Sequence, residues 1–217
     1  MVLPPTREVF QAIQDVTHRH GALFVFDEVK TAFRTAPGSV QARFGLMPDL
    51  TTVSKGLSNG WPVAAVVGRR DVMNSAAGMH LSATYHGDTA AMAAALTTLR
   101  LVQERGVADH VWALGQRLID GLNAISHDLD VPALSFGEPF PPMPFLRFNH
   151  PNPETNDALR TTFYEAMLAR GVLLHPRHMW FISYAHKAAD IDTTLEHAQS
   201  AMKVAREQCP ASRTRHS

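Results

Sequence analysis

The chain has 217 residues, of which 45% are hydrophobic and 18% are charged, and this balance excludes disorder over most of its length. Twenty basic and twenty acidic side chains give a formal net charge of zero, so nothing in the charge favours nucleic acid or an anionic membrane as a partner. A single cysteine, Cys209, excludes a disulfide framework and a thiolate metal cluster.

The chain starts MVLPPTREVF, which lacks a basic-then-apolar leader, and its apolar runs are all shorter than a membrane span. We therefore expect a cytoplasmic protein with no membrane partner. Twelve histidines invite a metal hypothesis, but HExxH and cysteine-based spacings are missing. We expect no metal site.

Helical and strand patterns alternate in the first half of the chain. Apolar spacing predicts a helix over residues 7–20, and the apolar run at 22–26 is typical of a parallel strand buried on both faces. Further strands are predicted at residues 50–53 and 63–68, and an alanine-rich helix at residues 87–105. This alternation indicates an α/β layer architecture.

The second half has a different pattern of elements. A long helix is predicted over residues 107–129, followed by a Pro-rich loop over 131–145 and a strand over 145–148. A helix over 156–170, a strand over 180–185 and a final helix over 190–207 complete the predicted elements. We expect a smaller α+β unit here. The predicted division assigns residues 1–106 to a large domain and residues 107–217 to a small domain.

Two polar side chains lie where predicted strands end. Asp27 follows the first strand and Lys55 follows the second, so parallel strands would bring both to the carboxyl edge of the sheet, where open α/β sheets bind ligands. The two could form a salt bridge, or they could hold a cofactor. Thr84 precedes the alanine-rich helix, whose first N–H groups could bind an anion. A lysine, a carboxylate and a phosphate dock together are what pyridoxal phosphate requires.

Four stretches resemble the class III pyridoxal-phosphate-dependent aminotransferases, in the branch that contains glutamate-1-semialdehyde aminomutase. They are FDEVKTAFR (26–34), ARFGLMPDLTTVSKGLSNGWPVAAVVGRRDVM (42–73), ATYHGDTAAMAAALTTL (83–99) and GVLLHPRHMWFISYAHKAADIDTTL (171–195). The resemblance implies an α/β fold: the second half of a fold-type I large domain plus a C-terminal α+β small domain. It also implies transfer of an amino group between a small-molecule amino donor and a keto acid or aldehyde.

The resemblance implies a role for each residue that matches a family motif. Asp27 would pair with the pyridine nitrogen, and Val29 would pack on the ring face. Lys55 would form the Schiff base with the cofactor and move protons. Thr84 would bind the phosphate of the neighbouring subunit's cofactor, which implies a homodimer with active sites at the interface.

The chain also departs from the family pattern. Ala32 stands where the family has glycine, and Asn59 replaces one glycine of the run after the lysine. The N-terminal half of the family, with its Gly-Ser/Thr phosphate loop, has no counterpart in these residues. We therefore expect the second half of an aminotransferase, from a truncated reading frame or from a split protein.

The same residues allow three alternative functions to be considered. A non-catalytic remnant and an aminomutase remain open, whereas a cofactor-free Schiff-base lyase would leave Asp27 and Thr84 without a purpose. His86 could line the active site, and Arg177 could meet a substrate carboxylate because arginine binds that group in a bidentate manner.

Overall fold

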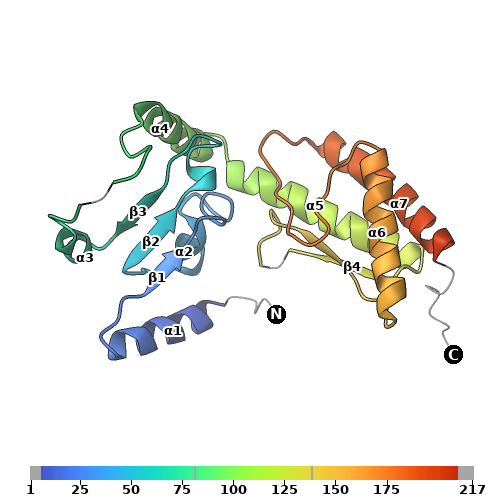
Figure 1. Ribbon diagram of the computed structural model, residues 1–217, viewed down its shortest axis with the longest axis horizontal. Helices are drawn as coiled ribbons and strands as arrows, with labels where there is room; N and C mark the ends of the chain where they lie inside the picture. The colour runs from blue at the N-terminus through green and yellow to red at the C-terminus, as the bar shows by residue number, and fades with distance from the viewer. Residues whose placement is uncertain (1–5, 81, 138, 210–217) are drawn as a thin grey trace. The chain divides into compact units, whose positions relative to one another are not determined.

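The computed structural model describes residues 6–80, 82–137 and 139–209. The chain folds into two compact units, Met1–Asp109 and His110–Ser217 (Figure 1). The first unit contains the following elements in chain order: α1 (Arg7–Arg19), β1 (Val25–Asp27), α2 (Ser39–Phe44), β2 (Leu50–Val53), the short 3-10 helix η1 (Lys55–Leu57), β3 (Ala65–Gly68), α3 (Arg70–Ser75) and α4 (Thr89–Glu104).

The first unit is built on a three-stranded sheet of order β1-β2-β3. β1 pairs with β2 in parallel, and β2 pairs with β3 antiparallel. The condition for Asp27 and Lys55 to emerge at one edge of the sheet, a parallel arrangement of their strands, is therefore met. The predicted burial of both strand faces is wrong, because Phe26 is buried whereas Val25 remains 47% exposed.

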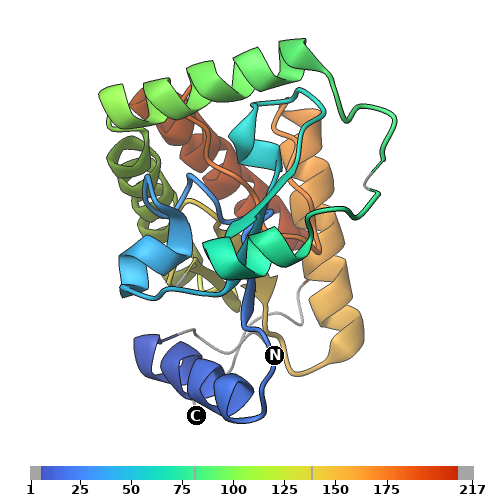
Figure 2. The ribbon, with the colours of Figure 1, turned by 90° about the vertical axis from the view of Figure 1, so that its left-hand side faces the viewer.

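Helix α1 packs on the sheet through one aromatic side chain. Phe10 contacts Phe26 edge-on at a centroid distance of 5.0 Å, and it also lies 5.8 Å from Phe44 of α2. The other apolar residues of the predicted helical stripe, Val9, Ile13 and Val16, are exposed. Figure 2 shows the unit with α1 at the bottom of the view and α4 at the top.

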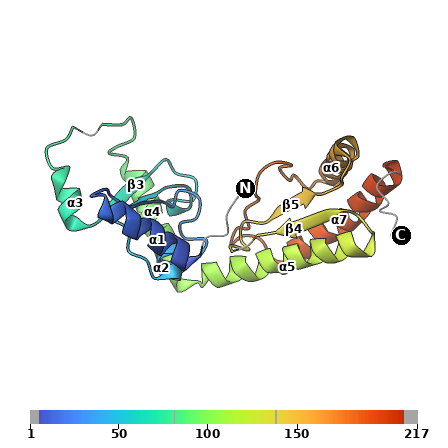
Figure 3. The same ribbon diagram turned by 90° about the horizontal axis from the view of Figure 1, so that it is seen from below.

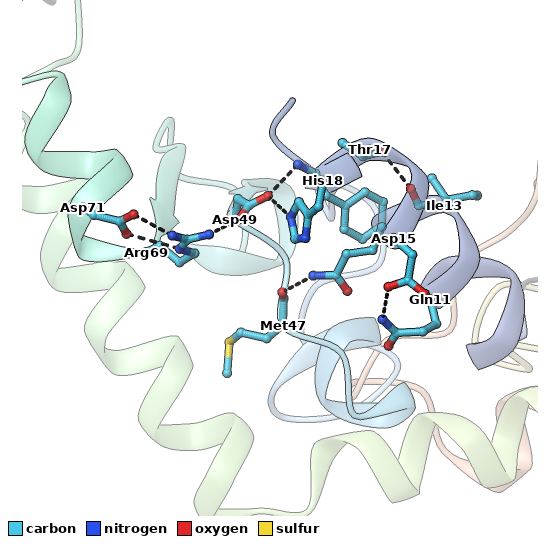
Figure 4. A network of polar contacts seen from close by, with 11 residues as sticks. Gln11, Ile13, Asp15, Thr17, His18, Met47, Asp49, Arg69 and Asp71 are labelled. Atoms are coloured by element: carbon cyan, nitrogen blue, oxygen red, sulfur yellow. Dashed lines mark hydrogen bonds and ion pairs between the residues drawn. The ribbon is translucent and has the colours of Figure 1, made fainter. Parts of the chain in front are cut away.

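A buried carboxylate ties the start of β2 to three other segments (Figure 4). Asp49 is only 1% exposed, and it accepts hydrogen bonds of 2.7 Å from the Phe24 backbone N–H and from Arg69 Nη1. His18 Nε2 of α1 also lies 2.7 Å from Asp49 Oδ2. The Phe24 N–H, and to a lesser degree His18 and Arg69, lower the pKa of Asp49 to about 2, although burial acts in the opposite direction.

The second unit combines a strand pair with long helices. Its elements are α5 (Val107–Asp128), which begins just before the unit boundary, then β4 (Ala133–Phe136), β5 (Phe145–Phe148), α6 (Pro153–Ala169) and α7 (Ala188–Gln208). β4 and β5 pair antiparallel, and α5 runs along them (Figure 3). The Asn123 side chain of α5 accepts from Ser135 N at 2.7 Å and donates to Ser135 O at 2.9 Å. Phe163, Met167 and Met202 of α6 and α7 are fully buried.

Two sequence predictions for the second unit are wrong. β4 lies inside the stretch predicted to be a Pro-rich loop. The predicted strand at residues 180–185 is extended chain instead, held by bonds from Trp180 N to Pro144 O at 2.8 Å and from Ile182 N to Pro142 O at 2.9 Å. Proline has no N–H to return such bonds, so a ladder cannot form.

None of the helices that the structure describes combines the length and the apolar character that a transmembrane span requires.

Asp49 predicts how stability depends on pH. Its pKa in the folded state, about 2, lies below the unfolded value of 3.8. The ionised carboxylate therefore adds to the free energy of unfolding above about pH 4, and this stabilisation is lost as the pH falls towards 2. That contribution is roughly 2 kcal/mol of unfolding free energy. Urea unfolding of wild type and Asp49→Asn between pH 6 and 2 checks this, because the gap between them should close at low pH.

Asp71→Asn is the matched control. Asp71 also binds Arg69, at 2.6 Å, but its side chain is 64% exposed, so this variant should follow the wild-type pH curve closely. Parallel curves for wild type and Asp49→Asn across the whole range would contradict the assignment.

Candidate functional site

Asp27 ends β1 at the carboxyl edge of the sheet. Register places it beside Thr52 of β2, and its carboxylate is exposed. Oδ1 accepts from the Val29 backbone N–H at 3.0 Å and from Thr52 Oγ1 at 3.4 Å. Within the described ranges Oδ2 accepts no hydrogen bond. The two bonds to Oδ1 therefore fix the orientation of the carboxylate, while Oδ2 can accept a hydrogen bond from a further donor. Val29 is half-buried immediately beyond.

The neighbouring carboxylate, Glu28, has the opposite environment. It is 1% exposed and accepts hydrogen bonds from Thr31 Oγ1 at 2.6 Å, Val40 N at 3.2 Å and Gln41 N at 3.1 Å. The last two N–H groups open α2, whose N-cap Gly38 has no side chain to bind them, so Glu28 caps that helix from a distance. Glu28 therefore fixes the loop that follows Asp27.

Sequence reasoning assigned Glu28 no role. The sequence feature that could have indicated a role was an acidic residue at the end of an apolar strand segment, directly after Asp27. A buried acid needs several donors, and these are supplied by residues 12 and 13 positions further along the chain. Only the fold brings them together.

Lys55 opens the loop between β2 and β3. Its side chain is exposed, and its backbone has φ +38°, a conformation that costs free energy for a residue with a Cβ. In the part of the chain that the structure describes, Nζ makes no hydrogen bond or ion pair. The salt bridge with Asp27, which the sequence left open, is therefore not formed here, and both groups remain available at the edge of the sheet.

Short contacts hold this loop in its conformation. Ser54 Oγ donates to Val63 O at 3.0 Å, and the buried Ser58 donates through Oγ to Trp61 O at 2.6 Å. Asn59 has φ +52°, which explains why it can replace the glycine of the family pattern, since asparagine tolerates that region well. The loop is thus closed at both ends around Lys55.

The residue after the lysine must be small. A Cβ at Gly56 would lie 3.0 Å from the carbonyl oxygen of Ala32. Ala32, where the family has glycine, is 1% exposed and packs with Val53, Leu57 and Ala95 in a small core cluster. The lysine loop therefore packs closely against the segment that follows Asp27.

The predicted phosphate residue lies in a different setting from the one expected. Thr84 is exposed in a turn, and α4 begins five residues later. Asp88 caps α4, with its Oδ1 accepting from Ala90 N at 2.9 Å and from Ala91 N at 3.3 Å. These N–H groups are therefore not free for an anion, contrary to expectation. The role of Thr84 stays a prediction.

The roles of two further sequence candidates, His86 and Arg177, stay predictions. His86 is exposed, and its backbone N–H donates to Ala83 O. Arg177 is exposed and donates its backbone N–H to His175 Nδ1. A cavity of about 640 Å³ in the second unit is lined by His175, His178, Trp180 and their neighbours, and Arg177 is not among its lining residues. Among the described side chains, no group of three or more His, Cys, Asp or Glu could hold a metal ion.

Comparison with known proteins gives consistent matches. The family profile described as aminotransferase class-III matches residues 2–202. Glutamate-1-semialdehyde 2,1-aminomutase of Laribacter hongkongensis (strain HLHK9) is 36% identical over 214 residues, which cover 92% of this chain and 49% of that protein. The protein of the same name from Thermomicrobium roseum is 37% identical over 93% of this chain and 49% of its own length.

A solved structure matches to the same extent. The internal aldimine form of the FumI protein of Sphingopyxis sp. MTA144, with pyridoxal phosphate, gives a TM-score of 0.86 at 29% identity. The match covers 97% of this chain and 50% of that one. The chain thus spans about half the length of the relatives it matches.

These findings define the class of protein. The chain belongs to the class-III aminotransferase family. Its fold is the C-terminal half of a fold-type I transferase, and pyridoxal phosphate is the cofactor of that family. The residues present fit this cofactor at two points: a carboxylate with one available oxygen for the ring nitrogen, and a lysine without a partner among the described residues for covalent attachment.

The short distance between Gly56 and the Ala32 carbonyl oxygen predicts that a methyl group at Gly56 lowers stability. Gly56→Ala should lower the free energy of unfolding by about 1 kcal/mol or more, because the Ala32 carbonyl belongs to the backbone and can move little. Gly87→Ala is the control, since a Cβ there meets nothing within 4 Å. Urea unfolding of the two variants compares them, and equal losses would rule out the tight contact as the cause.

Proposed function

We propose that this chain supplies the lysine and the ring-nitrogen carboxylate of a pyridoxal-phosphate-dependent aminotransferase. The reaction moves an amino group between an amino donor and a keto acid or aldehyde. The observation that carries the proposal is the placement of Asp27 and Lys55 at the carboxyl ends of two neighbouring parallel strands.

Asp27 is the partner of the ring nitrogen. Its Oδ1 is fixed by the Val29 N–H and the Thr52 hydroxyl, so Oδ2 is oriented to accept a hydrogen bond from a protonated pyridine. A carboxylate in this position keeps that proton in place. Val29, half-buried next to it, would support one face of the ring. When bound, pyridoxal phosphate supplies the electron sink that stabilises negative charge at the substrate α-carbon.

Lys55 is the covalent anchor and the group that moves protons. Its Nζ would hold the cofactor, and once released by the substrate amine it would take the α-proton as a general base and return it as a general acid. The positive φ of Lys55 and the small Gly56 set the direction of the side chain as the chain leaves β2. Thr84 would bind the phosphate of a neighbouring subunit's cofactor, which makes the proposed assembly a homodimer.

An intramolecular version of the reaction is the second candidate. It is favoured by the names of the two curated relatives, both 2,1-aminomutases at 36–37% identity. Single-turnover assays separate the two activities. In the transfer, one keto product is released per active site from the amino donor, whereas the mutase releases none. A third outcome, cofactor binding without either reaction, would identify a non-catalytic remnant.

Substitution of Lys55 tests the proposal. Pyridoxal phosphate added to wild type should produce a visible absorption band, and borohydride should then add the cofactor mass to the peptide that contains Lys55. Lys55→Ala should lose both signals because the amine proposed to bind the cofactor covalently is removed. Asp27→Asn should keep covalent attachment but slow α-proton removal at least about 100-fold, as expected for loss of the charge that holds the ring proton.

Lys203→Ala, an exposed lysine on α7, is the control and should match wild type in both measurements. Absence of the band in wild type, or borohydride labelling retained in Lys55→Ala, would overturn the proposed role.

A further inference from the structure

Glu28 lies between the two residues of its segment that are proposed to contact the cofactor, Asp27 and Val29. Its backbone N–H donates to Thr52 O at 2.9 Å, which extends the β1–β2 pairing one residue beyond the pair of Asp27 with Thr52. Its side chain is only 1% exposed. A side chain buried to this degree acts on a bound molecule only through its neighbours.

The Glu28 carboxylate closes the segment that follows it. Oε2 accepts from Thr31 Oγ1 at 2.6 Å and from Val40 N at 3.2 Å, and Oε1 accepts from Gln41 N at 3.1 Å. All three groups are donors, so they are complementary to a carboxylate that only accepts. The amide of a glutamine would direct its own N–H groups at one of these donors. Glu28→Gln therefore keeps the size of the side chain but breaks at least one hydrogen bond.

The closed segment contains two residues with a strained backbone. Phe33 has φ +63° and Ser39 has φ +68°, a region that costs free energy for residues with a Cβ. The two residues are joined directly, since Phe33 N donates to Ser39 Oγ at 3.2 Å. The Glu28 carboxylate binds the backbone N–H groups of the two residues after Ser39, and it thereby opposes release of this strain.

The same segment supports the lysine loop. Ala32 N donates to Glu28 O at 2.9 Å, and the Ala32 carbonyl oxygen would lie 3.0 Å from a Cβ at Gly56. Ala32 also packs with Leu57 of η1 in the core cluster. A change at Glu28 can therefore reach the lysine loop through Ala32.

We propose that Glu28 is a positioning residue for the reaction, which acts through Asp27 and Lys55 and fixes the spacing between them. This inference rests on the proposed function. A cofactor that is attached to Lys55 Nζ and donates its ring proton to Asp27 Oδ2 fits only when both groups are held at one separation. Functional geometry tolerates errors of only about 0.5 Å, and a displacement of about 1 Å can lower a rate about 100-fold. A buried acid that touches no ligand can thus control both cofactor binding and rate.

Glu28→Gln tests the proposal against a matched control, Asp49→Asn. Each variant neutralises one carboxylate that is 1% exposed, but Asp49 lies at the amino end of the strand pair, away from the candidate site. The first measurement uses the chain without cofactor and follows amide hydrogen exchange by NMR at Ala32 and at Leu57, whose N–H donates to Ser54 O at 2.8 Å. We expect Glu28→Gln to speed exchange at both amides at least about tenfold more than Asp49→Asn does.

The second measurement adds pyridoxal phosphate that carries an isotope label on its ring nitrogen. Glu28→Gln should keep the visible absorption band, because Lys55 is present, but it should bind the cofactor about tenfold more weakly and remove the substrate α-proton about 100-fold more slowly. Its ring-nitrogen NMR signal should move towards that of the unprotonated pyridine, since Asp27 holds the ring proton less well. A purely structural loss would leave this signal unchanged, as expected for Asp49→Asn.

Thr31→Val is the milder variant, and it replaces Glu28→Gln if that variant does not fold. It removes the hydroxyl donor from Glu28 and should give smaller changes in the same direction, whereas Thr31→Ser keeps the hydroxyl and should match wild type. Equal exchange in Glu28→Gln and Asp49→Asn, or a wild-type ring-nitrogen signal in Glu28→Gln, overturns the role of Glu28. Absence of the absorption band in wild type overturns the proposed function itself, so the two failures are distinguished by the wild-type chain.

Discussion

The parallel pairing of β1 with β2 is the constraint on which the candidate site depends. Two buried carboxylates hold it, one at each end. At the amino end, Asp49 accepts the Phe24 N–H and ties α1 and β3 to the start of β2. At the carboxyl end, the Glu28 N–H donates to Thr52 O at 2.9 Å while its side chain caps α2. The register fixed in this way brings Asp27 level with Thr52, and so to the same edge as the lysine.

Backbone strain is present at Lys55, one of the residues proposed to hold the cofactor. Lys55 has a left-handed φ, and Gly56 approaches the Ala32 carbonyl so closely that a methyl group would not fit without a shift. Such conformations persist only when surrounding contacts impose them, and here the hydroxyls of Ser54 and Ser58 close the loop. These contacts therefore maintain the strained backbone at Lys55, and they fix the position of this residue at the edge of the sheet.

The two faces of the sheet in the first unit have different surroundings. Its covered face contains the packing that keeps β2 and the lysine loop in place, whereas its open face includes Asp27. The first unit thus has its own core and still leaves apolar side chains, Val25 and Val66 among them, exposed on this face.

Sequence patterns determined much of this protein. Leu50–Val53 was predicted to the residue and the long helices to within a few residues, and Asp27 and Lys55 were predicted to follow strands that end where polar residues begin. Such features are local, because the spacing of apolar residues that indicates a helix or a strand involves only residues close in sequence. The tertiary structure alone decided that Glu28 and Asp49 are buried anchors and that Phe26 is buried while its strand neighbour Val25 is exposed among the described residues. Their hydrogen-bond partners lie up to 31 residues away, and burial depends on what packs against a strand, which the strand's own sequence does not specify.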